Sequence, residues 1–84
     1  MNVGMLWFDN DKARDLNTKV IRAADYYRKK YGHVPNMCYV HPSMLPTPKE
    51  KDSADKKMMA GNVEVRSAMT VLPNHFWIGE NGVN

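Results

Sequence analysis

Two short segments of this 84-residue sequence carry apolar residues on both alternate sets of positions, and a stretch with helical periodicity separates them. The first segment runs from Gly4 to Phe8, and the second runs from Met37 to His41 and stops at Pro42. A strand with one face in water alternates between apolar and polar residues, so these two segments are typical of strands buried on both faces. Any fold of this chain therefore has two apolar sheet faces to cover.

The stretch from about residue 11 to residue 31 has the periodicity of an amphipathic helix. Its apolar stripe follows helical spacing and consists of Leu16, Val20, Ala23, Ala24, Tyr27 and Tyr31. We expect Asp9, Asn10 or Asp11 to cap the first turn, and Gly32 to follow the last turn in a left-handed conformation. A strand, a helix and a strand in this order predict a βαβ unit with parallel strands and a right-handed crossover.

The second half of the chain predicts two further strands and a short helix. Residues 63–66 alternate between apolar and polar side chains, which predicts a strand with one face exposed to solvent. Residues 75–79 follow a turn signal and predict the final strand. Prolines mark residues 43–52 as a loop, and residues 53–60 predict a short helix with Ser53 as its N-cap and Gly61 after its end. The predicted fold is α/β (α+β-like), with the order β-α-β-(α)-β-β and one long helix packed on one face of a four-stranded mixed sheet. We expect residues 1–84 to form one domain, with residues 80–84 as a frayed tail.

The composition narrows the class of protein. Hydrophobic residues make up 43% of the chain and charged residues 25%, which is typical of a globular protein. The single cysteine, Cys38, permits no internal disulfide, and no Cys/His cluster has zinc spacing, so we expect no cofactor. A free cysteine without a secretion signal favours a cytoplasmic location. Every apolar stretch is too short to span a membrane, so we expect no membrane association.

The surplus of apolar sheet surface is the main clue to function. One long helix covers one face of the predicted sheet, and the short second helix and the proline-rich loop can cover only part of the other. We therefore expect a protein partner or a second copy of the chain to bury the remainder. This interpretation makes the protein an interaction or accessory module, with a homodimer as the simplest form.

A second interpretation is an accessory protein that binds nucleic acid. Its basic candidates lie on the long helix and are Lys19, Arg22, Lys29 and Lys30. Trp77, together with Tyr39 or Trp7, can form a platform on which bases stack, assisted by Arg66. The net charge of +3 is low for this class of protein, and a solvated helix face accounts for the helical lysines equally well.

A third interpretation, and the least favoured, is a small Mg²⁺-dependent phosphohydrolase or nuclease. Asp9-Asn10-Asp11 directly follows an apolar strand, and two carboxylates there can hold Mg²⁺. Over about eight residues this pattern is similar to the first motif of haloacid-dehalogenase-type phosphatases, and the chain is too short for the other motifs of that fold. His41 ends the second strand, so neighbouring parallel strands would bring it to the same sheet edge as Asp9. Helix capping is the simpler role for both aspartates.

Overall fold

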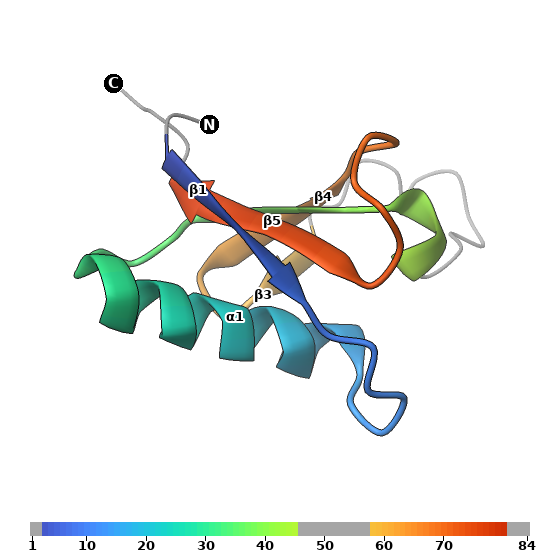
Figure 1. Ribbon diagram of the computed structural model, residues 1–84, viewed down its shortest axis with the longest axis horizontal. Coiled ribbons are helices and arrows are strands. Elements are labelled where there is room, and N and C mark those ends of the chain that lie inside the picture. The colour runs from blue at the N-terminus through green and yellow to red at the C-terminus, as the bar shows by residue number, and fades with distance from the viewer. Residues whose placement is uncertain (1–2, 46–57, 81–84) are drawn as a thin grey trace.

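The computed structural model describes residues 3–45 and 58–80, which form a mixed five-stranded sheet with one long helix on one face (Figure 1). The strands are β1 (Val3–Phe8), β2 (Met37–Val40), β3 (Met58–Ala60), β4 (Val63–Ser67) and β5 (His75–Glu80). The helices are α1 (Leu16–Tyr31) and a single 3₁₀ turn, η1 (Pro42–Met44). The predicted α+β class is confirmed, with five strands in place of four. No helix of the described segments has the length and the apolar character that crossing a bilayer requires.

The helix α1 begins at Leu16, so the predicted start near residue 11 was wrong. Its N-cap is Asp15, whose carboxylate accepts the N–H of Thr18 at 2.8 Å. The earlier aspartates shape the turn that leads into the helix instead: Asp9 accepts the N–H of Asp11, and Asp11 accepts the N–H of Ala13. The helix ends as predicted at Gly32, whose φ of 77° is a left-handed conformation.

The predicted apolar stripe of α1 faces the sheet over most of its length. Val20, Ala23 and Tyr27 are fully buried, while Leu16 and Ala24 pack against the core from its edge. The Tyr27 hydroxyl donates to the Glu80 carboxylate at 2.8 Å, which joins the helix to the last residue of β5. Glu80 is therefore a strand residue and not part of a frayed tail; residues 81–84 lie outside the described residues.

The sheet order is β1-β5-β2-β4-β3, and it corrects the predicted βαβ unit. The strands β1 and β2 run in the same direction, because β5 is antiparallel to both, but β5 lies between them. The only parallel neighbours among the described strands are β2 and β4. The patterns of β1 and β2 predict their direction, and β2 is largely buried on both faces. The predicted burial of β1 on both faces was wrong, because Leu6 and Phe8 are 59% and 55% exposed. The patterns also do not show that a later strand inserts between β1 and β2.

The short strand β3 replaces part of the predicted second helix. Met58–Ala60 forms a hairpin with β4 through the two-residue turn Gly61-Asn62, in which Gly61 has a φ of 61°. Gly followed by Asn between two strand-forming segments is a hairpin signal as well as a helix-end signal. Residues 53–57 of the predicted helix lie outside the described residues.

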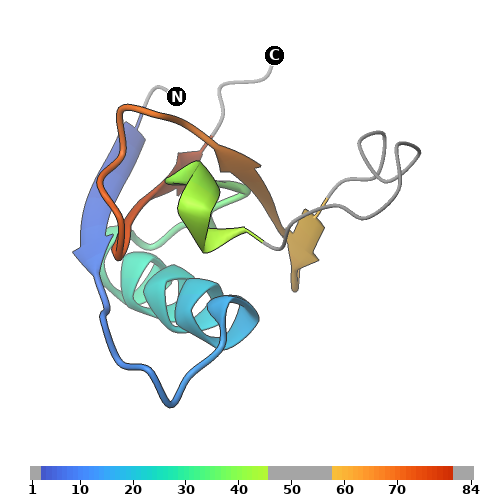
Figure 2. The ribbon, with the colours of Figure 1, turned by 90° about the vertical axis from the view of Figure 1, so that its right-hand side faces the viewer.

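Strand alternation divides the sheet into a covered face, against which α1 packs, and an open face on the other side (Figure 2). The covered face carries Met5, Trp7, Cys38, Val40, Met58, Ala60, Val63, Val65, Phe76 and Ile78. The open face carries Leu6, Phe8, Met37, Tyr39, Met59, Glu64, Arg66, His75 and Trp77. The strands β1 and β3 form its two edges (Figure 2).

Candidate functional site

The open face has a row of side chains that crosses four strands. The strand registers place Leu6 opposite Trp77, Trp77 opposite Tyr39, and Tyr39 opposite Arg66. Side chains directly opposite on antiparallel strands lie close enough to touch. Nearer the C-terminal end of β1, Phe8 stands opposite His75 with their ring centroids 5.0 Å apart. The open face therefore presents a band of aromatic and aliphatic groups.

Three apolar side chains of the open face are exposed to solvent. Leu6 is 59% exposed, Phe8 55% and Trp77 38%. The Trp77 indole lies over Gly4, because a Cβ built on Gly4 would stand 2.6 Å from an indole carbon. Only glycine at position 4 lets the indole come this close to the backbone of β1.

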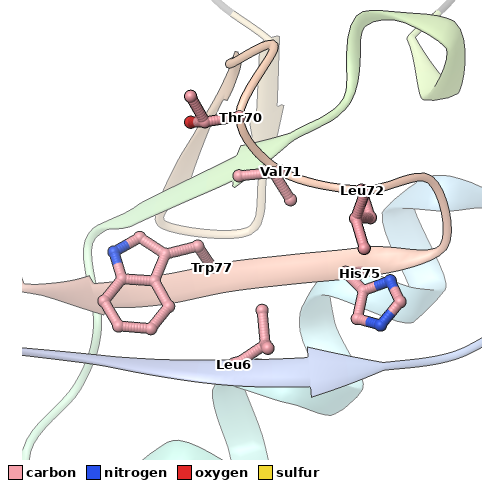
Figure 3. A pocket seen from close by; sticks show the side chains of 6 residues that line it. All are labelled: Leu6, Thr70, Val71, Leu72, His75 and Trp77. Carbon is pink, nitrogen blue, oxygen red and sulfur yellow. The ribbon is translucent and has the colours of Figure 1, made fainter.

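A pocket of about 380 Å³ opens beside this row, between β1, β5 and the loop 68–74 (Figure 3). Its lining residues are Leu6, Thr70, Val71, Leu72, His75 and Trp77. The loop side chains Val71 and Leu72 reach toward β5 and Leu6, so the loop forms the second wall (Figure 3). An apolar lining with a few polar groups is typical of sites that take one apolar group of a ligand.

The polar groups of the pocket come from Thr70 and His75. The Nδ1 atom of His75 lies 2.9 Å from the Pro73 carbonyl oxygen. A carbonyl oxygen only accepts, so Nδ1 carries the hydrogen and Nε2 is the acceptor of the neutral ring. The pocket can thus offer an imidazole acceptor and a threonine hydroxyl to a bound group.

Charge on the open face is nearly balanced. Arg66 Nε donates to a Glu64 carboxylate oxygen at 2.6 Å, and this bond raises the pKa of Arg66. The loop 68–74 contains no charged residue. The surface is therefore apolar and aromatic, without an excess of positive charge.

The basic residues predicted on α1 lie in a different layer from Arg66 and Trp77, so the structure does not bring the two groups together. Lys29 Nζ stands 3.1 Å from the Asp25 carboxylate, and Lys30 Nζ lies 5.4 Å from the ring centre of Tyr31. Arg22 is exposed, whereas Lys19 is only 7% exposed, so its assignment to a solvated face was wrong.

The two tryptophans also lie on opposite faces of the sheet. Trp7 is on the covered face, with its ring 5.0 Å from that of Tyr26, so its predicted place in a stacking platform was wrong. Trp77 and Tyr39 lie side by side on the open face, as the alternative with Tyr39 predicts. The sequence patterns single out these two residues and Arg66, but they give no sign of the wall formed by loop 68–74.

The residues predicted for metal-dependent chemistry lie at one end of the sheet without forming a cluster. The inserted strand β5 separates Asp9 from His41, and the Asp9 N–H donates to the Asn74 carbonyl at 3.0 Å. The Ala13 N–H is the main cause that lowers the pKa of Asp11. His41 Nδ1 accepts the N–H of Ser43 and so caps η1. Residues 3–45 and 58–80 contain no group of three or more His, Cys, Asp or Glu that could hold a metal ion.

Cys38 lies on the covered face and is completely buried. Burial raises the pKa of its thiol to about 12, so the thiolate is scarce at neutral pH. The thiol is therefore a packing group of the core.

No protein-family model, curated protein or solved structure matches this chain.

Proposed function

We propose that this protein is a protein-interaction module that binds a partner through the open face of its sheet. The observation that carries the proposal is the band of exposed apolar side chains, Leu6, Phe8 and Trp77, next to the pocket of about 380 Å³. Contiguous exposed apolar surface of this kind marks interaction sites in soluble proteins. Aromatic residues at the centre of such a surface are frequent anchors of binding energy.

The balance of charge favours a protein over a polyanion as the partner. Arg66 is the cation of the central row, and Glu64 already neutralises it. A nucleic acid or another polyanion gains most of its affinity from cations beside its phosphates. The basic residues of α1 lie behind the sheet and cannot supply them at the same surface.

The pocket indicates the chemistry of the partner segment. An aromatic or branched aliphatic side chain fits between Leu6, Leu72 and Trp77, which remove it from water. A hydrogen-bond donor next to that side chain would meet His75 Nε2. We therefore expect a peptide segment with one large apolar anchor and a neighbouring donor.

Selection of displayed random peptides on the immobilised protein tests the proposal. Peptides recovered from the selection should share an aromatic or aliphatic anchor and should bind Leu72→Ser at least about tenfold more weakly, because truncating an anchor contact costs more than 1 kcal/mol. Met69→Ser is the matched control: Met69 belongs to the same loop and is 75% exposed, but it does not line the pocket. Recovery of no peptide, or equal binding to the Leu72→Ser protein, would overturn the proposal.

A second candidate, binding of single-stranded nucleic acid, rests on the adjacent Trp77, Tyr39 and Arg66. Bases can stack on the two rings while the guanidinium contacts a phosphate. An oligothymidylate of roughly 12 nucleotides should then quench tryptophan fluorescence in a salt-dependent way, and Arg66→Ala should weaken the binding. Unchanged fluorescence at low salt would exclude this candidate.

Two further expectations stay predictions. A cytoplasmic location is supported by the free thiol of Cys38. Mg²⁺-dependent hydrolysis has the least support, because Asp9 and Asp11 each accept a backbone N–H in the turn before α1.

A further inference from the structure

The two edges of the sheet differ in how well they resist pairing with another strand. The edge strand β3 has three residues, Met58–Ala60. The edge strand β1 has six residues, Val3–Phe8, and carries no charge and no proline. Its pairing with β5 runs without a bulge from Val3 to Phe8. Natural proteins protect sheet edges with short strands, charges, prolines or bulges, and β1 has none of these.

The register of β5 shows which backbone groups β1 presents at its outer edge. The Asp9 N–H donates to the Asn74 carbonyl, so the backbone N–H and C=O of Asp9 point toward the side on which β5 lies. Backbone groups alternate in direction along a strand, so Trp7 and Met5 also point toward β5. The N–H and C=O groups of Gly4, Leu6 and Phe8 therefore point outward.

We propose that two copies of this chain pair through the outer edges of β1, antiparallel and centred on Leu6. In this register Leu6 faces Leu6 of the second copy, and Gly4 faces Phe8 in both directions. All three outward residues then form hydrogen-bonded pairs, which gives about six N–H···O bonds across the two-fold axis. Shifting the register by two residues would leave one outward residue of Val3–Phe8 without a strand partner.

The side chains of this register are complementary on the open face. Gly4 has no side chain, and the Trp77 indole lies over it. Phe8 of the second copy stands across from Gly4 and so meets the edge of that indole. The two leucines meet at the axis, where β1 brings no charge of its own. Each copy thus adds Phe8, which is 55% exposed in the single chain, to the rim of the other copy's pocket.

The covered face leaves room for this pairing. The helix α1 packs mainly against β5, β4 and β3, and it meets β1 at the covered face, where Tyr26 packs on Trp7. Figure 2 shows the same arrangement, with β1 at one side of the sheet and the helix under its middle. Pairing would join two sheets into one with ten strands, and the two pockets would lie on the same face on either side of the axis. This inference goes beyond the proposed function, because it concerns the edge of the sheet and does not need the pocket.

Disulfide trapping tests both the pairing and its register. Facing residues of a hydrogen-bonded antiparallel pair have Cα atoms about 5.5 Å apart, within the range a disulfide can bridge. Leu6→Cys should therefore give a covalent dimer under mild oxidation. Phe8→Cys is the matched control on the same strand and face, and its two copies would stand about 14 Å apart, too far to bridge.

Sedimentation equilibrium at tens of micromolar separates this inference from the proposed function. We expect a dimer for the native chain, a dimer for Leu72→Ser, and a monomer for Leu6→Glu, which places two carboxylates face to face at the axis. Met59→Glu, a change on the open face of the other edge strand, should leave the dimer intact. A native monomer, a trapped dimer with Phe8→Cys but not with Leu6→Cys, or loss of the dimer in Leu72→Ser would each overturn the inference. Loss of peptide binding alone would overturn only the proposed function.

Discussion

The two faces of this sheet are built from the same strands, but one forms the core and the other is exposed to solvent. On the covered face Phe76, Ile78 and Val40 are fully buried beneath α1. On the open face the alternate residues of β1 and β5, Leu6 and Trp77, remain 59% and 38% exposed. Both sets are apolar, so hydrophobicity does not distinguish core from surface here. The number of covering elements does, because the described residues contain only one long helix.

Phe76 and Trp77, which are adjacent in β5 and point to opposite faces, give the sharpest test of this comparison. Phe76→Ala should lower the free energy of unfolding by about 3–5 kcal/mol, since it empties a fully buried site. Trp77→Ala should cost less than half as much, because the indole already contacts water. Urea denaturation followed by circular dichroism measures both values.

Equal losses for the two substitutions would contradict the division into a covered and an open face. They would show that Trp77 is buried in solution, which would be the case if a permanent interface covered the open face. Repeating the measurement at several protein concentrations separates that case, because the stability of a dimer rises with concentration.

The fold was predictable from local patterns wherever a segment's own sequence decides its conformation. The helical stripe ending at Gly32 and the doubly apolar strands β1 and β2 are examples. The insertion of β5 between β1 and β2 was not predictable, because pairing partners depend on contacts distant in the chain. The strand β3 was missed because Gly61 fits both the end of a helix and a hairpin turn, and only pairing with β4 decides between them.

The pH dependence of the free energy of unfolding tests whether water is excluded from the covered face. Burial raises the pKa of Cys38 from 9.0 to about 12, so the unfolded chain ionises at lower pH than the folded one. This contribution to stability is complete below pH 9.0 and is lost as the pH rises toward about 12. Between pH 8 and pH 10.5 we expect a loss of about 2 kcal/mol from this group. Tyr27, whose pKa burial and the Glu80 hydrogen bond raise to about 12, acts in the same direction above pH 10.0.

Urea denaturation of Cys38→Ala at the same two pH values isolates the thiol. This variant should be less stable at pH 8, because a small cavity replaces the sulfur, but its loss up to pH 10.5 should be about 2 kcal/mol smaller. Identical losses in the two proteins would mean that water reaches Cys38 and that α1 covers the sheet less tightly than the structure shows.

Only the strand residues of the candidate site were predictable, because local sequence patterns do not show how distant segments pack. Alternation along β5 and β2 predicts that Trp77 and Tyr39 can share a face, and the registers place them opposite each other. The wall of the pocket comes from Val71 and Leu72, in a loop without regular periodicity. The position of such a loop depends on the strands that it joins, which local sequence does not reveal. The separation of Arg66 from the lysines of α1 likewise depends on how distant elements pack together.

The hydrogen bond between Tyr27 and Glu80 ties the covering helix to the sheet, and its loss should loosen the covered face alone. Tyr27→Phe removes the hydroxyl and leaves a part-buried carboxylate without that donor, so we expect a loss of about 1.5 kcal/mol. Tyr26→Phe is the matched control, because Tyr26 is 47% exposed and should change stability by less than about 0.5 kcal/mol. Thermal denaturation of both variants gives the comparison, and binding of selected peptides to the open face should be unchanged in each. A larger effect from Tyr26→Phe than from Tyr27→Phe would contradict the tie between Tyr27 and Glu80 as the main hydrogen bond that holds the helix.

Lys19 tests where the covered region of α1 ends, and the expected effect is the smallest. Lys19 lies one residue before the fully buried Val20 and is itself only 7% exposed, whereas the Lys29 side chain is 68% exposed. Trp7 Nε1 is the one buried side-chain nitrogen or oxygen of the described residues without a hydrogen bond, so the Lys19 ammonium is not an unpartnered buried charge. Its methylene stem is therefore the buried part, in the manner usual for lysines that extend along apolar surface.

Lys19→Met keeps most of this stem and should be neutral within about 0.5 kcal/mol, whereas Lys19→Ala should cost about 1 kcal/mol through lost packing. Lys29→Ala should stay within about 0.5 kcal/mol, since Lys29 contributes only an exposed ion pair with Asp25. If Lys19→Met proves as damaging as Lys19→Ala, the charge and not the stem matters, and the covered region stops before Lys19.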